Sequence, residues 1–171
     1  MSGTSSKRLN SRRKGQSAER RLVKLFEVWW DAKFFRTPGS GAFATRGFAG
    51  VDTSSMAGDI VTPDQTFPFC VESKKVEGWT LEQMLTSDKT HMHKWWDQAV
   101  EETPQGKIPL LVFTKNHAPL YAMMRVEDMS GALDLVTYKN GFQCMLREQH
   151  VRVFALSYLL TSPKTSWIYA R

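Results

Sequence analysis

The run IPLLVFTK, which begins at Ile108, is apolar over its first six residues. A strand without polar alternation has both of its faces buried, so this run is predicted to be a central strand of a sheet. The segment PLYAMMRV, which begins at Pro119, is predicted to be its neighbour. A central strand needs a layer on each side. The chain is therefore predicted to be α/β, with a mixed central sheet flanked by helices.

Two longer segments have the spacing of helices. Residues 16–35 carry apolar side chains at every third or fourth position, which predicts a helix with one buried face. These side chains are Leu22, Leu25, Phe26, Trp29 and Trp30. Residues 79–103 are predicted to be mostly helical. Residues 127–135 fit a short helix, and residues 142–160 fit a strand and a helix equally well.

The length of 171 residues fits one domain with a core of its own. We expect residues 1–15, which are polar and basic, to be a disordered arm and residues 16–171 to form a single domain. No run of 18 or more apolar residues is present, so no membrane contact is expected. Cys70 and Cys144 are too few for a disulfide framework or a zinc site. No glycine-rich loop has the form of a P-loop, so no nucleotide cofactor is expected.

The net charge of +6 is concentrated near the N-terminus. Residues 1–24 hold eight Lys or Arg and one acid, whereas the remainder holds 15 basic and 16 acidic residues. A basic arm of this kind predicts contact with a polyanion, and DNA is the predicted partner. The alternative is a solubilising tail. The candidate DNA contacts in this segment are Lys7, Arg8, Arg12, Arg13, Lys14 and Arg20.

A hairpin is predicted from two β-rich runs, residues 58–62 and 67–74, joined by a turn. Strand alternation puts Glu72 and Lys74 on one face of the second strand. A turn centred on residues 64 and 65 brings Asp59 close to the level of Glu72. Two neighbouring carboxylates repel each other unless a proton or a divalent cation lies between them. Oxygen ligands and a phosphate suit Mg²⁺, and a lysine beside them can stabilise charge on the phosphate.

A carboxylate in the first helix and a long glycine-rich segment are two further candidate features of a functional site. Glu19 shares the inward face of the first helix, close to the start of that helix, which is an unusual place for a carboxylate. Residues 36–58 form a long segment with five glycines and are predicted to be a loop, with positive charge from Arg36 and Arg46.

Asp59, twelve residues and then Glu72-Ser73-Lys74 resemble the D-(x)n-E-x-K core of the PD-(D/E)xK nuclease superfamily. Gly58 stands where the name of the superfamily has Pro. The resemblance implies a restriction-endonuclease-like fold.

The order of motifs resembles, more narrowly, the archaeal-type and phage Holliday junction resolvases. KGQSAER at residues 14–20 is similar to their KGxxxER segment, and RTPGSG at residues 36–41 is similar to their Arg-x-Pro-x-Ser-Gly loop. The resemblance runs from about residue 12 to residue 125. The loop between Gly41 and Asp59 is longer than in the short archaeal resolvases.

The resemblance implies a metal site and a water-activating group. Asp59, Glu72 and Glu19 would bind Mg²⁺, for which Mn²⁺ can substitute, and the backbone carbonyl of Ser73 would be a further ligand. Lys74 would position or polarise the water that attacks the phosphodiester.

Other positions would contact DNA or complete the catalytic site. Arg36 and Ser40 would contact the scissile strand or its flanking phosphates, and Arg46 is a further candidate contact. Gln98 would orient water or phosphate. The alternatives are that Ser40 is an ordinary turn residue and that Gln98 is a surface residue of its helix. Asp97, Glu101 and Glu102 are predicted to form a solvated face of that helix.

The activity implied is that of a metal-dependent DNA endonuclease, and the substrate implied is a four-way junction. Two symmetric cuts require two sites, so a homodimer is expected. The likeness to phage proteins implies the cytoplasm of a bacterial host. Two alternatives stay open. One is a nuclease of the same fold that cuts duplex, nicked or flap DNA, and the other is a non-catalytic DNA-binding accessory protein of recombination.

Overall fold

The computed structural model describes residues 3–37, 57–87 and 89–168, with side chains from residue 15 onward except that of Leu85. No helix in these ranges is long and apolar enough to cross a membrane. Most of the predicted glycine-rich loop, with Ser40 and Arg46, lies outside the described residues.

The described strands form one mixed sheet in the order β1-β2-β3-β4-β5-β7-β6. Among the described strands only β3 and β4 pair in parallel, and the segment between them carries the crossover helix α3. The other neighbours are antiparallel. The strands are β1 Phe35–Arg36, β2 Ile60–Val61, β3 Phe69–Lys75, β4 Ile108–Thr114, β5 Tyr121–Arg125, β6 Phe142–Leu146 and β7 Gln149–Ala155.

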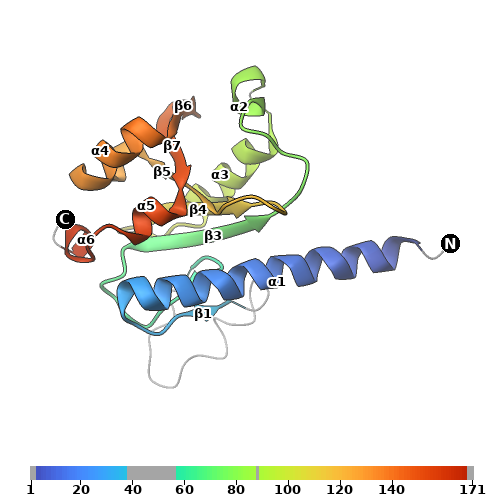
Figure 1. The fold of residues 1–171 in the computed structure, drawn as a ribbon, viewed down its shortest axis with the longest axis horizontal. Coiled ribbons are helices and arrows are strands. Elements are labelled where there is room, and N and C mark those ends of the chain that lie inside the picture. Colours follow the sequence, from blue (N-terminus) through green and yellow to red (C-terminus); the bar gives the residue numbers. More distant parts are fainter. Residues whose placement is uncertain (1–2, 38–56, 88, 169–171) are drawn as a thin grey trace.

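Helices cover both faces of this sheet (Figure 1). Every residue of β4 is buried, as the apolar run predicted. Its side chains alternate between two clusters: Leu110 and Val112 pack with α1, and Leu111 and Phe113 pack with α3. The α/β prediction with a flanked mixed sheet is thereby confirmed. The helices are α1 Gly3–Trp30, α2 Gln83–Thr86, α3 His91–Glu101, η1 Val126–Asp128, α4 Gly131–Asn140, α5 Leu156–Leu160 and α6 Thr165–Ile168.

The first helix differs from its prediction. It begins at Gly3 rather than near residue 16, so most of the segment expected to be a disordered arm is helical. Residues 3–15 contain no proline and include several Lys and Arg, which favour helix even without an apolar face. Apolar spacing detects only the part of a helix that packs on a core. Figure 1 shows the N-terminal turns of α1 extending past the end of β3.

The ambiguous segment at residues 142–160 divides into β6, β7 and α5. The hairpin of β2 and β3, the neighbouring strands β4 and β5, and a short helix after Glu127 are as predicted. That residues 16–171 make a single domain stays a prediction.

Candidate active site

The hairpin of β2 and β3 places Asp59 beside the end of β3. Ile60 pairs with Val71 in the antiparallel register, so Asp59 lies level with Glu72, as predicted. The backbone N–H of Asp59 donates to the carbonyl of Val71 at 2.8 Å. The backbone N–H of Ser73 donates to Oδ2 of Asp59 at 2.9 Å. The carboxylate of Asp59 is therefore held against the backbone of β3.

Gly58 permits this close approach. Its φ is +91°, and a Cβ at this position would lie 2.6 Å from the carbonyl oxygen of Val71. Proline is restricted to a φ near −65°, so it could not adopt this conformation. Thr37 also holds the backbone of Gly58 and Asp59 in place. Its N–H donates to the carbonyl of Asp59 at 2.9 Å, and its Oγ1 donates to the carbonyl of Gly58 at 2.7 Å.

The remaining polar groups lie on the face of β3 that is turned toward α3 and away from α1. Lys74 Nζ donates to Oε1 of Glu72 at 2.5 Å and to Oε1 of Gln98, on α3, at 2.9 Å. Gln98 Nε2 donates to Oε1 of Glu102 at 2.9 Å. The thiol of Cys70 lies 3.8 Å from the carbonyl oxygen of Glu102. Glu72 and Lys74 share one face of β3, as predicted, and Cys70 lies on the same face beside the end of α3.

The two carboxylates have raised pKa values. Glu72 is only 3% exposed, and burial is the main cause that raises its pKa to about 7, followed by the negative charge of Asp59. The hydrogen bond and positive charge of Lys74 oppose this rise. Burial also raises the pKa of Asp59, against the Ser73 N–H and the charge of Lys74. One lysine does not compensate two partly desolvated carboxylates, so the site favours an added proton or cation.

The donor set fits a hard divalent cation. Asp59, directly before β2, and Glu72, on β3, supply carboxylate oxygens. The N–H of Ser73 faces Asp59, and the N–H and C=O of one strand residue point to the same edge, so the carbonyl of Ser73 is directed there too. Oxygen ligands of this type are those that Mg²⁺ takes. Burial raises the pKa of Cys70 to about 11, so this neighbour is a neutral thiol and not a thiolate ligand.

Glu19 is close to Asp59 and forms an ion pair with Arg36. Its Oε2 accepts from Nη1 of Arg36 at 3.0 Å, and its negative charge contributes to the raised pKa of Asp59. Within the described ranges no group of three or more His, Cys, Asp or Glu side chains is arranged to hold a metal ion. The structure thus brings Asp59, Glu72, Lys74 and Gln98 together, and Glu19 as a metal ligand stays a prediction.

The predicted DNA contacts are only partly described. Arg20 is exposed on α1, and Arg36 is half-buried beside Glu19. The remaining candidates in the first helix lie in its N-terminal turns, where side chains are not described: Lys7, Arg8, Arg12, Arg13 and Lys14.

Sequence reasoning missed two residues of the site. The sequence predicts a solvated helix face for Glu102, although its spacing of four from Gln98 is a signal that the two side chains meet. Thr37 falls within the segment that the sequence predicts to be a loop. Its contacts with Gly58 and Asp59 depend on how β1 pairs with β2, which no local pattern reveals.

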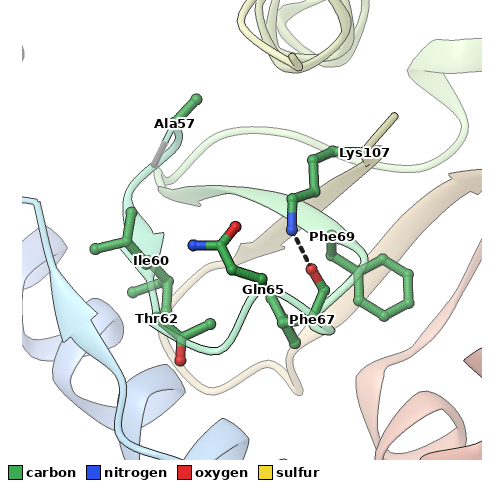
Figure 2. A pocket seen from close by; sticks show the side chains of 8 residues that line it. Ala57, Ile60, Thr62, Gln65, Phe67, Phe69 and Lys107 are labelled. Carbon is green, nitrogen blue, oxygen red and sulfur yellow. Dashed lines mark hydrogen bonds between the residues drawn. The ribbon is translucent and has the colours of Figure 1, made fainter. Parts of the chain in front are cut away.

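A pocket beside the hairpin is separate from the carboxylates. Figure 2 shows its lining, in which Lys107 donates to the carbonyl oxygen of Phe67. None of the lining residues is acidic: Ala57, Ile60, Val61, Thr62, Gln65, Phe67, Phe69 and Lys107. The chemistry of the site therefore belongs to the end of β3 and not to this pocket.

Comparisons with known proteins identify the family to which this chain belongs. Residues 10–160 match the model of a family described as "Phage putative PDDEXK endonuclease". The chain is also 27% identical over 117 residues to Protein D14 of Escherichia phage T5, a match that covers 63% of this chain and 66%, just under two thirds, of that protein. No solved structure gave a significant match. The mixed sheet flanked by helices is consistent with the restriction-endonuclease-like fold of such nucleases. Because the family model covers most of its length, the chain belongs to this phage family of PD-(D/E)xK endonucleases.

Proposed function

We propose that this protein is a Mg²⁺-dependent DNA endonuclease and that its preferred substrate is the four-way Holliday junction. The observation that carries the proposal is the pair Asp59 and Glu72: Asp59, directly before β2, lies level with Glu72 on β3, and Lys74 donates a hydrogen bond to Glu72. Burial is the main cause that raises the pKa of each carboxylate, and the charge of Asp59 raises the pKa of Glu72 further. A divalent cation between the two would stabilise both charges. Mn²⁺ is expected to substitute for Mg²⁺, because it accepts the same oxygen donors.

Each residue of the site has a proposed task. Asp59, Glu72 and the carbonyl of Ser73 would hold the ion, and Glu19 would join them from α1. When bound, Mg²⁺ lowers the pKa of water and stabilises charge on phosphate oxygens. Lys74 uses two of its three N–H groups on Glu72 and Gln98, which leaves one for the attacking water or the phosphate.

The choice of DNA as the substrate is supported by the distribution of charge. Residues 1–24 hold eight basic residues, and the N-terminal turns of α1 extend past the end of β3 at which Glu72 and Lys74 lie (Figure 1). Basic side chains there would contact the phosphates of a junction arm, and affinity would fall as salt is added. Two symmetric cuts in one junction require two sites, so the active species would be a two-fold homodimer. It would act in the cytoplasm of the bacterial host.

The test compares a labelled four-way junction with linear duplexes of the same arm sequences, in Mg²⁺. The expected result is a pair of symmetric nicks in the junction and no cut in the duplexes. Asp59→Asn and Lys74→Ala should each abolish cutting. Lys75→Ala is the matched control, since it removes the same charge from the next residue of β3, whose side chain lies on the other face.

Other outcomes distinguish the alternatives. Equal cutting of junction and duplex, still lost in Asp59→Asn, would retain the nuclease and reject junction specificity. Tight binding of the junction without any product in Mg²⁺ or Mn²⁺ would reject the enzyme and favour a DNA-binding accessory protein.

A further inference from the structure

A line of hydrogen bonds leads away from the candidate site along α3. Lys74 donates to Oε1 of Gln98 at 2.9 Å, and Nε2 of Gln98 donates to Oε1 of Glu102 at 2.9 Å. We propose that Glu102 is a positioning residue, which fixes the side-chain amide of Gln98 so that this amide holds the Lys74 ammonium beside Glu72. The inference deepens the proposed function and depends on it for the role of Lys74.

The chemistry of the three groups allows only one orientation of the amide. An ammonium has donors and no acceptor, so Gln98 must present its oxygen to Lys74. An ionised carboxylate accepts and does not donate, so Glu102 binds only the NH₂ side of the amide. The terminal torsion of glutamine is broad and close to two-fold, so a free Gln98 could present either side. The hydrogen bond from the NH₂ group of Gln98 to Glu102 selects the orientation in which the amide oxygen faces Lys74.

The fold holds Glu102 where this contact can form. Gln98 and Glu102 are four residues apart and share one side of α3. Glu102 is the C-terminal cap of α3, and its backbone N–H donates to the carbonyl of Gln98 at 2.9 Å. Its own carbonyl lies 3.8 Å from the thiol of Cys70, two residues before Glu72 on β3. The backbone at Glu102 is therefore fixed to both the helix and the strand that carry the site.

Loss of Glu102 has a specific consequence. If the amide rotates, its NH₂ group faces the ammonium, and Lys74 keeps only Glu72 as an acceptor. The ammonium can then leave the position from which its remaining N–H serves the reaction. Turnover should fall more than substrate binding, because the phosphate contacts of the basic turns of α1 are unaffected.

The first test is steady-state cleavage by Glu102→Ala. We expect kcat to fall about tenfold, as for the loss of one hydrogen bond to a charged group, with KM nearly unchanged. Glu102→Gln retains an acceptor and should keep most of the activity. Glu102→Ala should add little to the effect of Gln98→Ala, since both remove the same support from Lys74. Glu101→Ala is the matched control, because it removes the same charge from the neighbouring exposed residue.

A second test needs neither metal nor DNA. In the metal-free protein, the side-chain NH₂ of Gln98 should give a pair of ¹H–¹⁵N signals that are dispersed and protected from hydrogen exchange. Glu102→Ala should collapse this protection and Glu101→Ala should not. Unchanged Gln98 signals, additive losses in the double variant, or equal activity of Glu102→Ala and Glu101→Ala would each overturn the proposal. If the native protein cuts no DNA, the proposed function fails, while the amide signals still decide whether Glu102 orients Gln98.

Discussion

Gly58 lies one residue before Asp59 and has a φ of +91°, with the backbone of Val71 against it. Two features of this position exclude any residue with a side chain. The φ lies in the left-handed region that L side chains rarely adopt, and the space for a side chain is already filled. Any other residue would have to move the backbone around Asp59 away from β3.

We predict that Gly58→Ala lowers the free energy of unfolding by roughly 2 kcal/mol or more, since it combines backbone strain with overpacking. DNA cleavage should fall about a hundredfold, because a displacement of Asp59 by about 1 Å suffices for that loss. Denaturant unfolding and single-turnover cleavage measure the two effects.

Gly78→Ala is the control for this prediction. Gly78 also has a positive φ, of +80°, but a Cβ there would meet no atom within 4 Å. The strain of φ alone should cost about 1 kcal/mol and leave cleavage intact. Equal cleavage by the two alanine variants would show that the close approach to Val71 does not position Asp59.

The sequence allowed part of the site to be predicted at this scale. Strand alternation and the short turn were sufficient to bring Asp59, Glu72 and Lys74 to one place. Glu102 was not predicted to take part, because its contact depends on where the end of α3 lies against β3. That placement is decided by packing of the tryptophans of α3 on the sheet and not by the local sequence.

At the scale of elements, the side chain of Arg152 links α4 to the sheet through hydrogen bonds and an ion pair. It lies on β7, is 3% exposed, and forms an ion pair with the carboxylate of Asp134. Its Nη1 also donates to the carbonyl of Asp134 at 3.0 Å and to Oγ1 of Thr137 at 3.2 Å. Its Nη2 donates to Oε1 of Gln143, on β6, at 2.6 Å. One guanidinium thus joins a helix and two strands.

We predict that Arg152→Met lowers the free energy of unfolding by roughly 2 kcal/mol. The loss is smaller than for a fully buried ion pair, because Asp134 is half exposed and can be hydrated again. Arg147→Gln breaks an exposed ion pair with Asp97 and should change stability by less than about 0.5 kcal/mol. Urea unfolding of both variants makes the comparison, and similar midpoints would contradict the role of Arg152.

The elements differed in how far the sequence revealed them. The strand β4 and the hairpin were predicted because their apolar patterns are simple. The first turns of α1 were not, because they carry no apolar stripe. The segment of β6, β7 and α5 was ambiguous, since Arg152 interrupts the apolar pattern of β7 with a charge that pairs with Asp134 of α4 in the folded chain.

At the scale of the whole molecule, the paired carboxylates link stability to pH. The pKa of Glu72 is about 7 in the folded protein, against 4.5 for the ordinary group. Because the folded-state pKa is raised, the stability associated with the protonated group is complete below about pH 4.5 and is lost as pH rises toward 7. The raised pKa of Asp59 acts in the same direction.

We therefore predict that the metal-free protein loses stability between about pH 5 and pH 7.5. Glu72→Gln should flatten this dependence and Glu101→Gln should not. Addition of Mg²⁺ at pH 7.5 should restore stability to the native protein and little to Glu72→Gln. Chemical denaturation with chelator, at both pH values, measures the effect. A native protein whose pH dependence matches that of Glu72→Gln would contradict it.

The contacts of Thr37 have a consequence for how such a protein can diversify. Its hydrogen bonds to Gly58 and Asp59 join the two points at which the chain leaves and re-enters the sheet. The entropic cost of closing a loop grows only slowly with its length, so a segment inserted between these points lowers the stability of the fold only slightly. The ends of that segment stay beside Asp59 whatever its sequence. Relatives could thus differ in the length and sequence of this segment while the residues at its two ends keep the same hydrogen bonds.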